Sequence, residues 1–152
     1  MSLSMVNPFD LRTIFLAKHA QHVVLIHFPI ALFMIGVLFD LLSQGKRDSQ
    51  VAIAAYLNLS VAAIVVSPAY ATGVLTWQFV LGGAKLKGLI LLHLVAASCA
   101  ALLVLASWLI HWRARRSEQL SLPRYRIPIE LLGVAVIALT AHFGGFLSGL
   151  NS

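Results

Sequence analysis

Charge is scarce in this sequence. Lys, Arg, Asp and Glu together make up 11% of the 152 residues, whereas a soluble domain usually carries about 25%. Hydrophobic residues account for 60%, and the mean hydropathy is +0.91. A soluble fold of this length has too little interior to bury so much apolar side chain. The composition therefore excludes an ordinary soluble domain and indicates an integral membrane protein.

Cysteine and acidic residues are also few. The single cysteine, Cys99, lies within an apolar run, which excludes disulfides and cysteine-based iron–sulfur or zinc sites. Five acids face 11 lysines and arginines, giving a net charge of +6. The basic residues gather between the apolar segments, as they do in loops that flank membrane helices. We therefore expect the lipid bilayer, and not nucleic acid, as the partner of this charge.

Four long apolar segments are present, each long enough to cross about 30 Å of hydrocarbon as a helix. The expected spans are residues 22–42, 51–78, 88–112 and 127–148. They predict an all-α integral membrane protein, an up-and-down four-helix bundle formed by residues 22–150. Pro29 and Pro68 predict kinks in the first two spans. Residues 1–21 mix charge with helically spaced apolar residues, which favours a short interfacial helix.

An even number of spans places both termini on one side of the membrane. The loops at 43–50 and 111–127 then share the other side, with most of the arginines. The charges on that side are Lys46, Arg47, Arg113, Arg115, Arg116, Arg124 and Arg126, and those on the terminal side are Arg12, Lys18, Lys85 and Lys87. The positive-inside rule puts the arginine-rich side in the cytoplasm. We expect a multi-pass protein of the bacterial inner membrane with both termini in the periplasm.

Three histidines, His27, His93 and His142, lie within three different spans. Each is expected roughly one to two helical turns below the outer boundary. Histidines in membrane helices are costly and usually functional. Spans one and three are diagonal in an up-and-down bundle, so His27 and His93 would face a cofactor from opposite sides. Two imidazoles on facing helices are suitable axial ligands for haem b, with His142 as an alternative ligand or part of a second site for haem or quinone.

Small and aromatic residues accompany these histidines at the same depth. Gly73, Gly144 and Gly145 leave room for a flat ring near the backbone, although glycines in membrane helices also serve close helix packing. Trp77 is placed to fill the space between haem and quinone, or to pack ordinarily. The basic residues of the terminal side are placed to pair with haem propionates.

Other polar residues lie near the opposite ends of the spans. His111, beside Trp112, has the position of an aromatic-belt residue. Asp40 is expected to pair with Lys46, Arg47 or a basic residue of the other cytoplasmic loop. Glu130 lies in the first turn of its span, where the helix dipole favours an anion. A proton-relay role for Asp40 and Glu130 is an alternative hypothesis.

The segment HFPIALFMIGVLFDLL at 27–42 resembles the opening of a family of small bacterial membrane proteins, the domain-of-unknown-function family DUF2231. The resemblance extends to ATGVLTW at 71–77, LLHL at 91–94 and HFGGFLSG at 142–149. It implies a four-helix membrane protein. Similar domains are fused to cytochrome c-like or Rieske-like modules, so the resemblance also implies a redox setting.

Together these features predict a haem b electron-transfer subunit of a larger redox complex. It would connect an external, periplasmic redox partner with quinone. No catalytic triad, phosphate-binding loop or nucleotide fingerprint occurs in the sequence, so we expect a non-catalytic subunit. One alternative is a cofactor-free anchor subunit. The other is a small metal-handling protein with a copper or zinc site at His27, His93 and His142.

Overall fold

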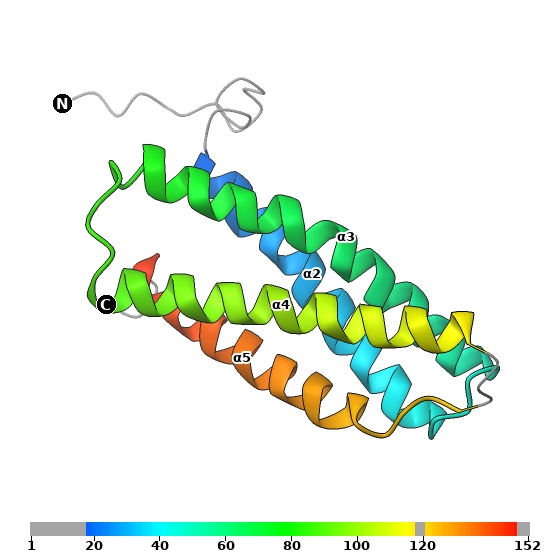
Figure 1. Ribbon diagram of the computed structural model, residues 1–152. Coiled ribbons are helices and arrows are strands. Elements are labelled where there is room, and N and C mark those ends of the chain that lie inside the picture. Colours follow the sequence, from blue (N-terminus) through cyan, green and yellow to red (C-terminus); the bar gives the residue numbers. More distant parts are fainter. Residues whose placement is uncertain (1–17, 118–120, 149–152) are drawn as a thin grey trace.

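Four long helices make up the fold in the computed structural model, which describes residues 18–117 and 121–148 (Figure 1). They are α2 (Lys18–Ser43), α3 (Gln50–Phe79), α4 (Gly88–Arg116) and α5 (Arg126–Leu147). All four are long and apolar enough to cross a membrane. The predicted all-α four-helix membrane bundle is therefore confirmed, with spans close to the expected bounds. Residues 1–17 lie outside the described residues, so the interfacial helix expected over 1–21 stays a prediction.

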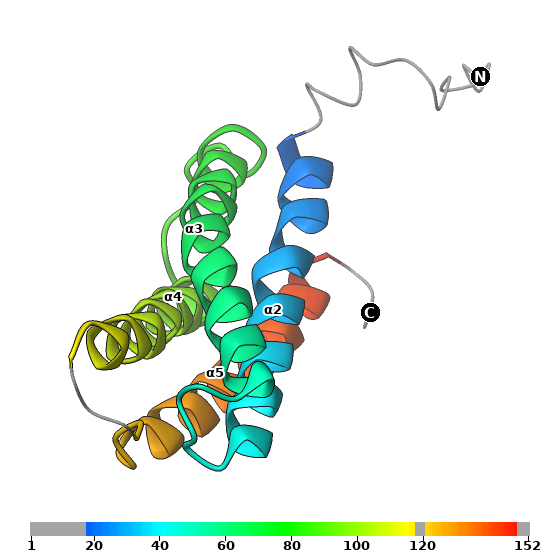
Figure 2. The same cartoon turned by 90° about the vertical axis from the view of Figure 1, so that its right-hand side faces the viewer.

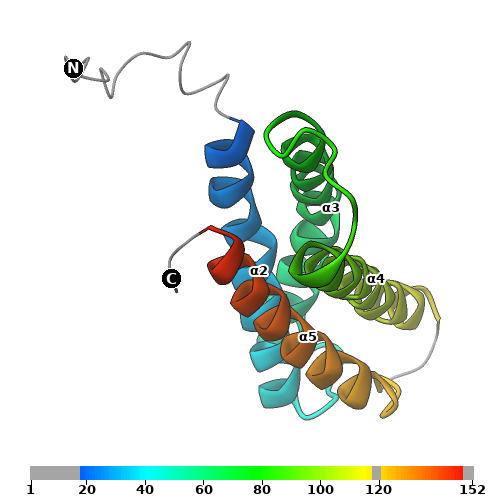
Figure 3. The same cartoon turned by 90° about the vertical axis from the view of Figure 1, so that its left-hand side faces the viewer.

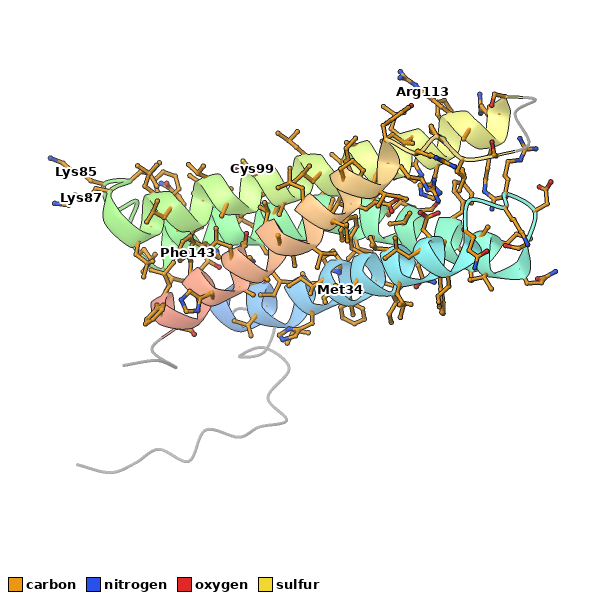
Figure 4. All side chains as sticks on the ribbon, turned by 90° about the horizontal axis from the view of Figure 1, so that it is seen from below. Met34, Lys85, Lys87, Cys99, Arg113 and Phe143 are labelled. Carbon is orange, nitrogen blue, oxygen red and sulfur yellow. The ribbon has the colours of Figure 1, made fainter. Side chains whose placement is uncertain are left out.

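Successive helices run in opposite directions, so the connections fall at two ends. The turn at 44–49 and the described residues of the next connection, 117 and 121–125, share one end, which we call the arginine end. Residues 80–87 form the connection at the other end, the lysine end. Figure 4 shows Lys85 and Lys87 projecting from the lysine end, with Arg113 towards the opposite end. The predicted up-and-down order is thus present.

The helices pack as two pairs. α2 lies along α3, and α4 lies along α5, and the two pairs cross at an angle (Figures 2 and 3). Further contacts join α3 to α4 and, over a shorter stretch, α2 to α5. This leaves α2 and α4 on the diagonal, as expected for spans one and three.

Small residues line the buried face of α3. Its buried residues are Ala52, Ala55, Leu59, Ala62, Ala63, Ala69 and Thr76. Most of them are separated by three, four or seven residues, which places them on one helix face. Small side chains let neighbouring membrane helices approach closely. Large apolar residues such as Ile64 and Leu102 point outwards, at 71% and 66% exposure. An apolar outer surface of this kind suits contact with lipid.

Arginines and backbone bonds hold the arginine end together. Arg47 donates to the carbonyls of Ala114 at 3.1 Å and Ser117 at 2.7 Å, which satisfies the last turn of α4. Arg115 donates to the Ala52 carbonyl at 3.0 Å. The Leu122 amide donates to Gly45 O at 3.2 Å. These bonds join the turn at 44–49 and the start of α3 to the end of α4 and the connection that follows it.

Candidate functional site

A buried ionic cluster lies at the arginine end, formed by Asp40, His111, Arg126 and Glu130. α2 supplies Asp40, α4 supplies His111, and α5 supplies Arg126 and Glu130. The exposed fractions are 0% for both acids, 1% for His111 and 3% for Arg126. Charged groups are almost never buried so completely unless they are paired or bind an ion. We therefore expect these four buried side chains to be paired with one another or to bind an ion.

The cluster contains two short polar contacts that are themselves close together. Arg126 Nε donates to Asp40 Oδ2 at 2.6 Å, and His111 Nε2 donates to Glu130 Oε1 at 2.8 Å. His111 Nε2 also lies 3.7 Å from Asp40 Oδ1. One ligand atom from each of Asp40, His111 and Glu130 lies within 4.8 Å of the others. The histidine thus stands between the two carboxylates.

Several buried polar atoms of this region have no hydrogen-bond partner within the described part of the chain. They include Asp40 Oδ1, Glu130 Oε2 and Ser107 Oγ. Ser107 lies one helical turn before His111 and is fully buried. Buried polar atoms are normally paired, and an unpaired one costs free energy. These two carboxylate oxygens are therefore able to accept a cation or a proton.

Helical spacing explains why these residues meet. The buried face of α4 runs through Val104, Ser107, His111 and Ala114, and that of α5 through Arg126, Glu130, Gly133 and Ile137. Each series recurs every three or four residues, so its members share one face. At the arginine end of the bundle, the buried faces of α4 and α5 meet Asp40 of α2.

The expectation for His111 is wrong. It is buried and hydrogen-bonded to Glu130, whereas an aromatic-belt residue lies at the membrane surface. Its neighbour Trp112 stacks with Trp108 at 6.0 Å and carries Arg116 over its ring at 4.3 Å. Because adjacent residues of a helix point about 100° apart, Trp112 faces the surface while His111 faces inwards. The pairing of Asp40 with a basic residue of the loop expected at 111–127 is confirmed by Arg126, which is the first residue of α5 in the structure.

His27 of α2 and His93 of α4 both lie in the half of the bundle nearer the lysine end. The ring of His27 is exposed, and its Nδ1 donates to Val23 O at 2.5 Å. His93 is half-buried against α5, where its Nδ1 donates to Thr140 O at 3.1 Å. In both rings, Nδ1 is the nitrogen that donates to the backbone carbonyl.

His142 is exposed and contacts aromatic residues of its own helix. Its ring meets Phe146 edge-on at 4.9 Å and lies 6.2 Å from Phe143. Within the described ranges, one group of three metal-ligating side chains has ligand atoms within 4.8 Å, namely Asp40, His111 and Glu130. The rings of His27, His93 and His142 are not brought together in this way.

The room beside two of the predicted glycines is filled by histidine rings. A Cβ added at Gly73 would lie 2.9 Å from His22 Cε1, and one at Gly144 would lie 3.2 Å from His93 Cε1. His22 is half-buried and its Nδ1 bonds Ala69 O at 3.2 Å. The two glycines therefore let imidazoles enter the α2–α3 and α4–α5 contacts.

The remaining predicted residues make local contacts at the lysine end. Trp77 is half-buried, and its Nε1 donates to Ala84 O at 2.9 Å. The Gly145 carbonyl accepts from Ser148 Oγ at 2.9 Å. Each contact helps to end its helix, α3 or α5, at this side of the bundle.

The comparison with protein families identifies the family of this chain. The family described as "Predicted membrane protein (DUF2231)" matches residues 18–149, which span all four helices. The chain belongs to this family. The resemblance seen in the HFPIAL segment is thus confirmed. No curated protein and no solved structure matches the chain, so function has to be argued from the residues themselves.

Sequence reasoning missed the ionic cluster, although its members carried a signal. Asp40, His111 and Glu130 lie near the arginine ends of their predicted spans, and Arg126 directly precedes the last span. Two acids, one histidine and one arginine at a common depth are enough to suggest mutual pairing. Considered one at a time, Arg126 is typical of a loop charge, His111 of an aromatic-belt residue and Glu130 of an acid at a helix N-terminus, so the sequence does not show which of them meet.

Proposed function

We propose that this DUF2231 protein is a membrane subunit that binds haem b through His27 and His93. In this role it passes electrons between an external redox partner and quinone in the bacterial inner membrane. The single observation that carries the proposal is the shared orientation of the two rings. Each gives its Nδ1 to a backbone carbonyl, Val23 O for His27 and Thr140 O for His93.

This orientation has a chemical consequence. A neutral imidazole has one N–H group and one lone pair. A carbonyl that accepts from Nδ1 fixes the proton there and leaves the lone pair on Nε2. Metal-bound histidines are commonly held in this way, because the bond fixes the ring and raises the basicity of the ligand. Both rings therefore have the tautomer that an axial haem ligand needs.

The donor set fits haem b, and the surroundings limit where the haem could lie. His27 is exposed on α2, so its Nε2 is accessible to a group bound on the outside of the bundle. The spaces beside Gly73 and Gly144 already hold the rings of His22 and His93. Lys85 and Lys87 project from the lysine end, where they are available to pair with propionates. When bound, haem would supply one-electron transfer, while the chain supplies ligands and apolar surroundings.

A reduced-minus-oxidised visible spectrum of the purified protein tests the proposal. We expect a Soret band and an α-band that are lost in both His27→Ala and His93→Ala. Leu102→Ala changes an exposed residue of α4 and should keep the spectrum. A wild-type protein without these bands, purified from cells that make haem, would contradict the proposal. Bands lost in His142→Ala but kept in His93→Ala would move the ligand assignment to His142.

A cofactor-free anchor subunit is the second candidate. The filled spaces beside Gly73 and Gly144 favour it, because they are where a porphyrin edge was expected. In that case the imidazoles serve helix packing, and the subunit holds partner redox proteins at the membrane. Haem-free protein that copurifies with a redox complex would support this second function.

A further inference from the structure

We propose that Asp40, His111 and Glu130 form a binding site for one divalent transition-metal cation, such as Zn²⁺ or Mn²⁺, at the arginine end of the bundle. The first support is geometric. The three side chains come from α2, α4 and α5, and their ligand atoms lie within 4.8 Å of one another. Atoms that share one ion with bonds of roughly 2.0–2.2 Å lie at most about 4.4 Å apart. His111 Nε2 lies 2.8 Å from Glu130 Oε1 and 3.7 Å from Asp40 Oδ1, so both pairs are already within that limit.

The second support comes from the buried oxygens that have no donor in the described part of the chain. Asp40 Oδ1 is 3.7 Å from His111 Nε2 without a hydrogen bond between them. Glu130 Oε2 is likewise buried and unpaired. Both acids are 0% exposed, so water on the outside does not compensate. A cation between them would bind the two carboxylate oxygens that have no hydrogen bond within the described residues.

The charges favour a cation. Asp40 and Glu130 carry two negative charges and Arg126 carries one positive charge, so the cluster has a net negative charge when His111 is neutral. Nη1 of Arg126 also donates to Leu122 O at 3.4 Å and Pro123 O at 3.2 Å, which holds the guanidinium beside Asp40 Oδ2. On binding, Nε2 of the neutral His111 ring would give up the proton that it now donates to Glu130, and Nδ1 would take up a proton, so that the ring stays neutral and Nε2 can bind the ion.

The ligand types indicate which ions suit the site. One imidazole and two carboxylates form a nitrogen and oxygen set, which suits zinc, manganese or iron in the divalent state. The absence of a thiolate disfavours soft monovalent copper. Arg126 has a positioning role here. Its 2.6 Å bond to Asp40 Oδ2 fixes the carboxylate and leaves Oδ1 turned towards the histidine.

The test uses the full-length protein in detergent after treatment with a chelator. Zn²⁺ is titrated by calorimetry, and Co²⁺ is titrated by visible absorption as a spectroscopic probe of the ligands. We expect one ion per chain, and a loss of affinity of about tenfold or more in Glu130→Gln and Asp40→Asn. His111→Gln should also alter the Co²⁺ spectrum, because nitrogen ligation is removed.

A matched control removes one acid from the same end of the bundle. Asp48→Asn changes an exposed carboxylate, 73% accessible, and should bind as the wild type does. A wild type that binds neither ion stoichiometrically would overturn the proposal, even if variants fail to fold. Equal affinity in the wild type, Glu130→Gln and Asp40→Asn would also overturn it and show adventitious binding elsewhere. The haem spectrum is a separate measurement, so the two proposals can fail independently.

Discussion

At the scale of single residues, the ion pair of Arg126 and Asp40 is the most consequential contact. Both side chains are buried, and the guanidinium Nε approaches the carboxylate to 2.6 Å. Removing charges from water is expensive, so such a pair contributes little net stability. Breaking it is a different matter, because the remaining charge stays buried without a partner.

Arg126→Met should therefore destabilise the fold by about 3–5 kcal/mol. The substitution keeps much of the side-chain volume but leaves Asp40 unpaired. The free energy of unfolding, measured by denaturant titration in mixed micelles, checks this value. The double variant Asp40→Leu and Arg126→Met should recover most of the loss, because no buried charge remains. An Arg126→Met protein as stable as the wild type would contradict the role of the pair.

The histidines show how a residue's neighbours decide its role. His27 and His111 both lie within apolar spans, yet His27 is exposed and bonds its own helix, while His111 is buried and bonds α5. The four residues before each are mostly apolar, VVLI before His27 and SWLI before His111. Only the direction in which the ring points separates a surface ligand candidate from a member of a buried cluster.

At the scale of helices, α2 and α5 touch through a glycine. A Cβ built at Gly133 would lie 2.8 Å from Cζ of Phe33, whose side chain is completely buried. Phe33 also belongs to the hydrophobic core with Leu59 and Val104. The ring of Phe33 therefore lies directly against the backbone of α5, and α5 has no space there for a side chain.

Gly133→Ala should destabilise the bundle by about 1–3 kcal/mol, the usual cost of overpacking a core. The added methyl must displace either Phe33 or α5. Thermal unfolding monitored by circular dichroism in detergent provides the measurement. Phe33→Leu in the same chain should restore part of the stability, because the shorter side chain vacates the position. If Gly133→Ala unfolds at the wild-type temperature, the helices are not in close contact at this point.

At the scale of the whole molecule, the distribution of basic residues sets the proposed orientation. The arginine end carries most of the charge, and the lysine end carries Lys85 and Lys87 in its connection. The positive-inside rule then puts the arginine end in the cytoplasm. In that orientation the proposed cation site faces the cytoplasm, and the proposed haem ligands lie towards the periplasm.

Cysteine labelling tests this orientation. In a Cys99→Ser background, Lys85→Cys should react with a membrane-impermeant thiol reagent in intact spheroplasts. Asp48→Cys, in the turn at the arginine end, should react only after the membrane is permeabilised. The opposite pattern would invert the topology and would place the cation site outside.

The sequence alone determined the class of the fold and its boundaries. Length, hydropathy and scarcity of charge specify four membrane helices, because apolar segments of this length are stable in lipid only as helices. Short connections then require neighbouring helices to be antiparallel, which puts α2 and α4 on the diagonal. The family resemblance also rested on sequence, since the HFPIAL segment is local and continuous.

The tertiary structure alone decided which polar residues meet. The helices are apolar all round, so no polar stripe in the sequence marks the inward face. The rotation of each helix is set by packing, with small residues on α3 and Gly133 on α5 allowing close approach. That rotation turns His111 inwards to Asp40 and Glu130, and turns His27 outwards. A rotation of α4 by about 100° would turn Trp112 inwards in place of His111, which is why the cluster could be recognised only once the four helices were seen together.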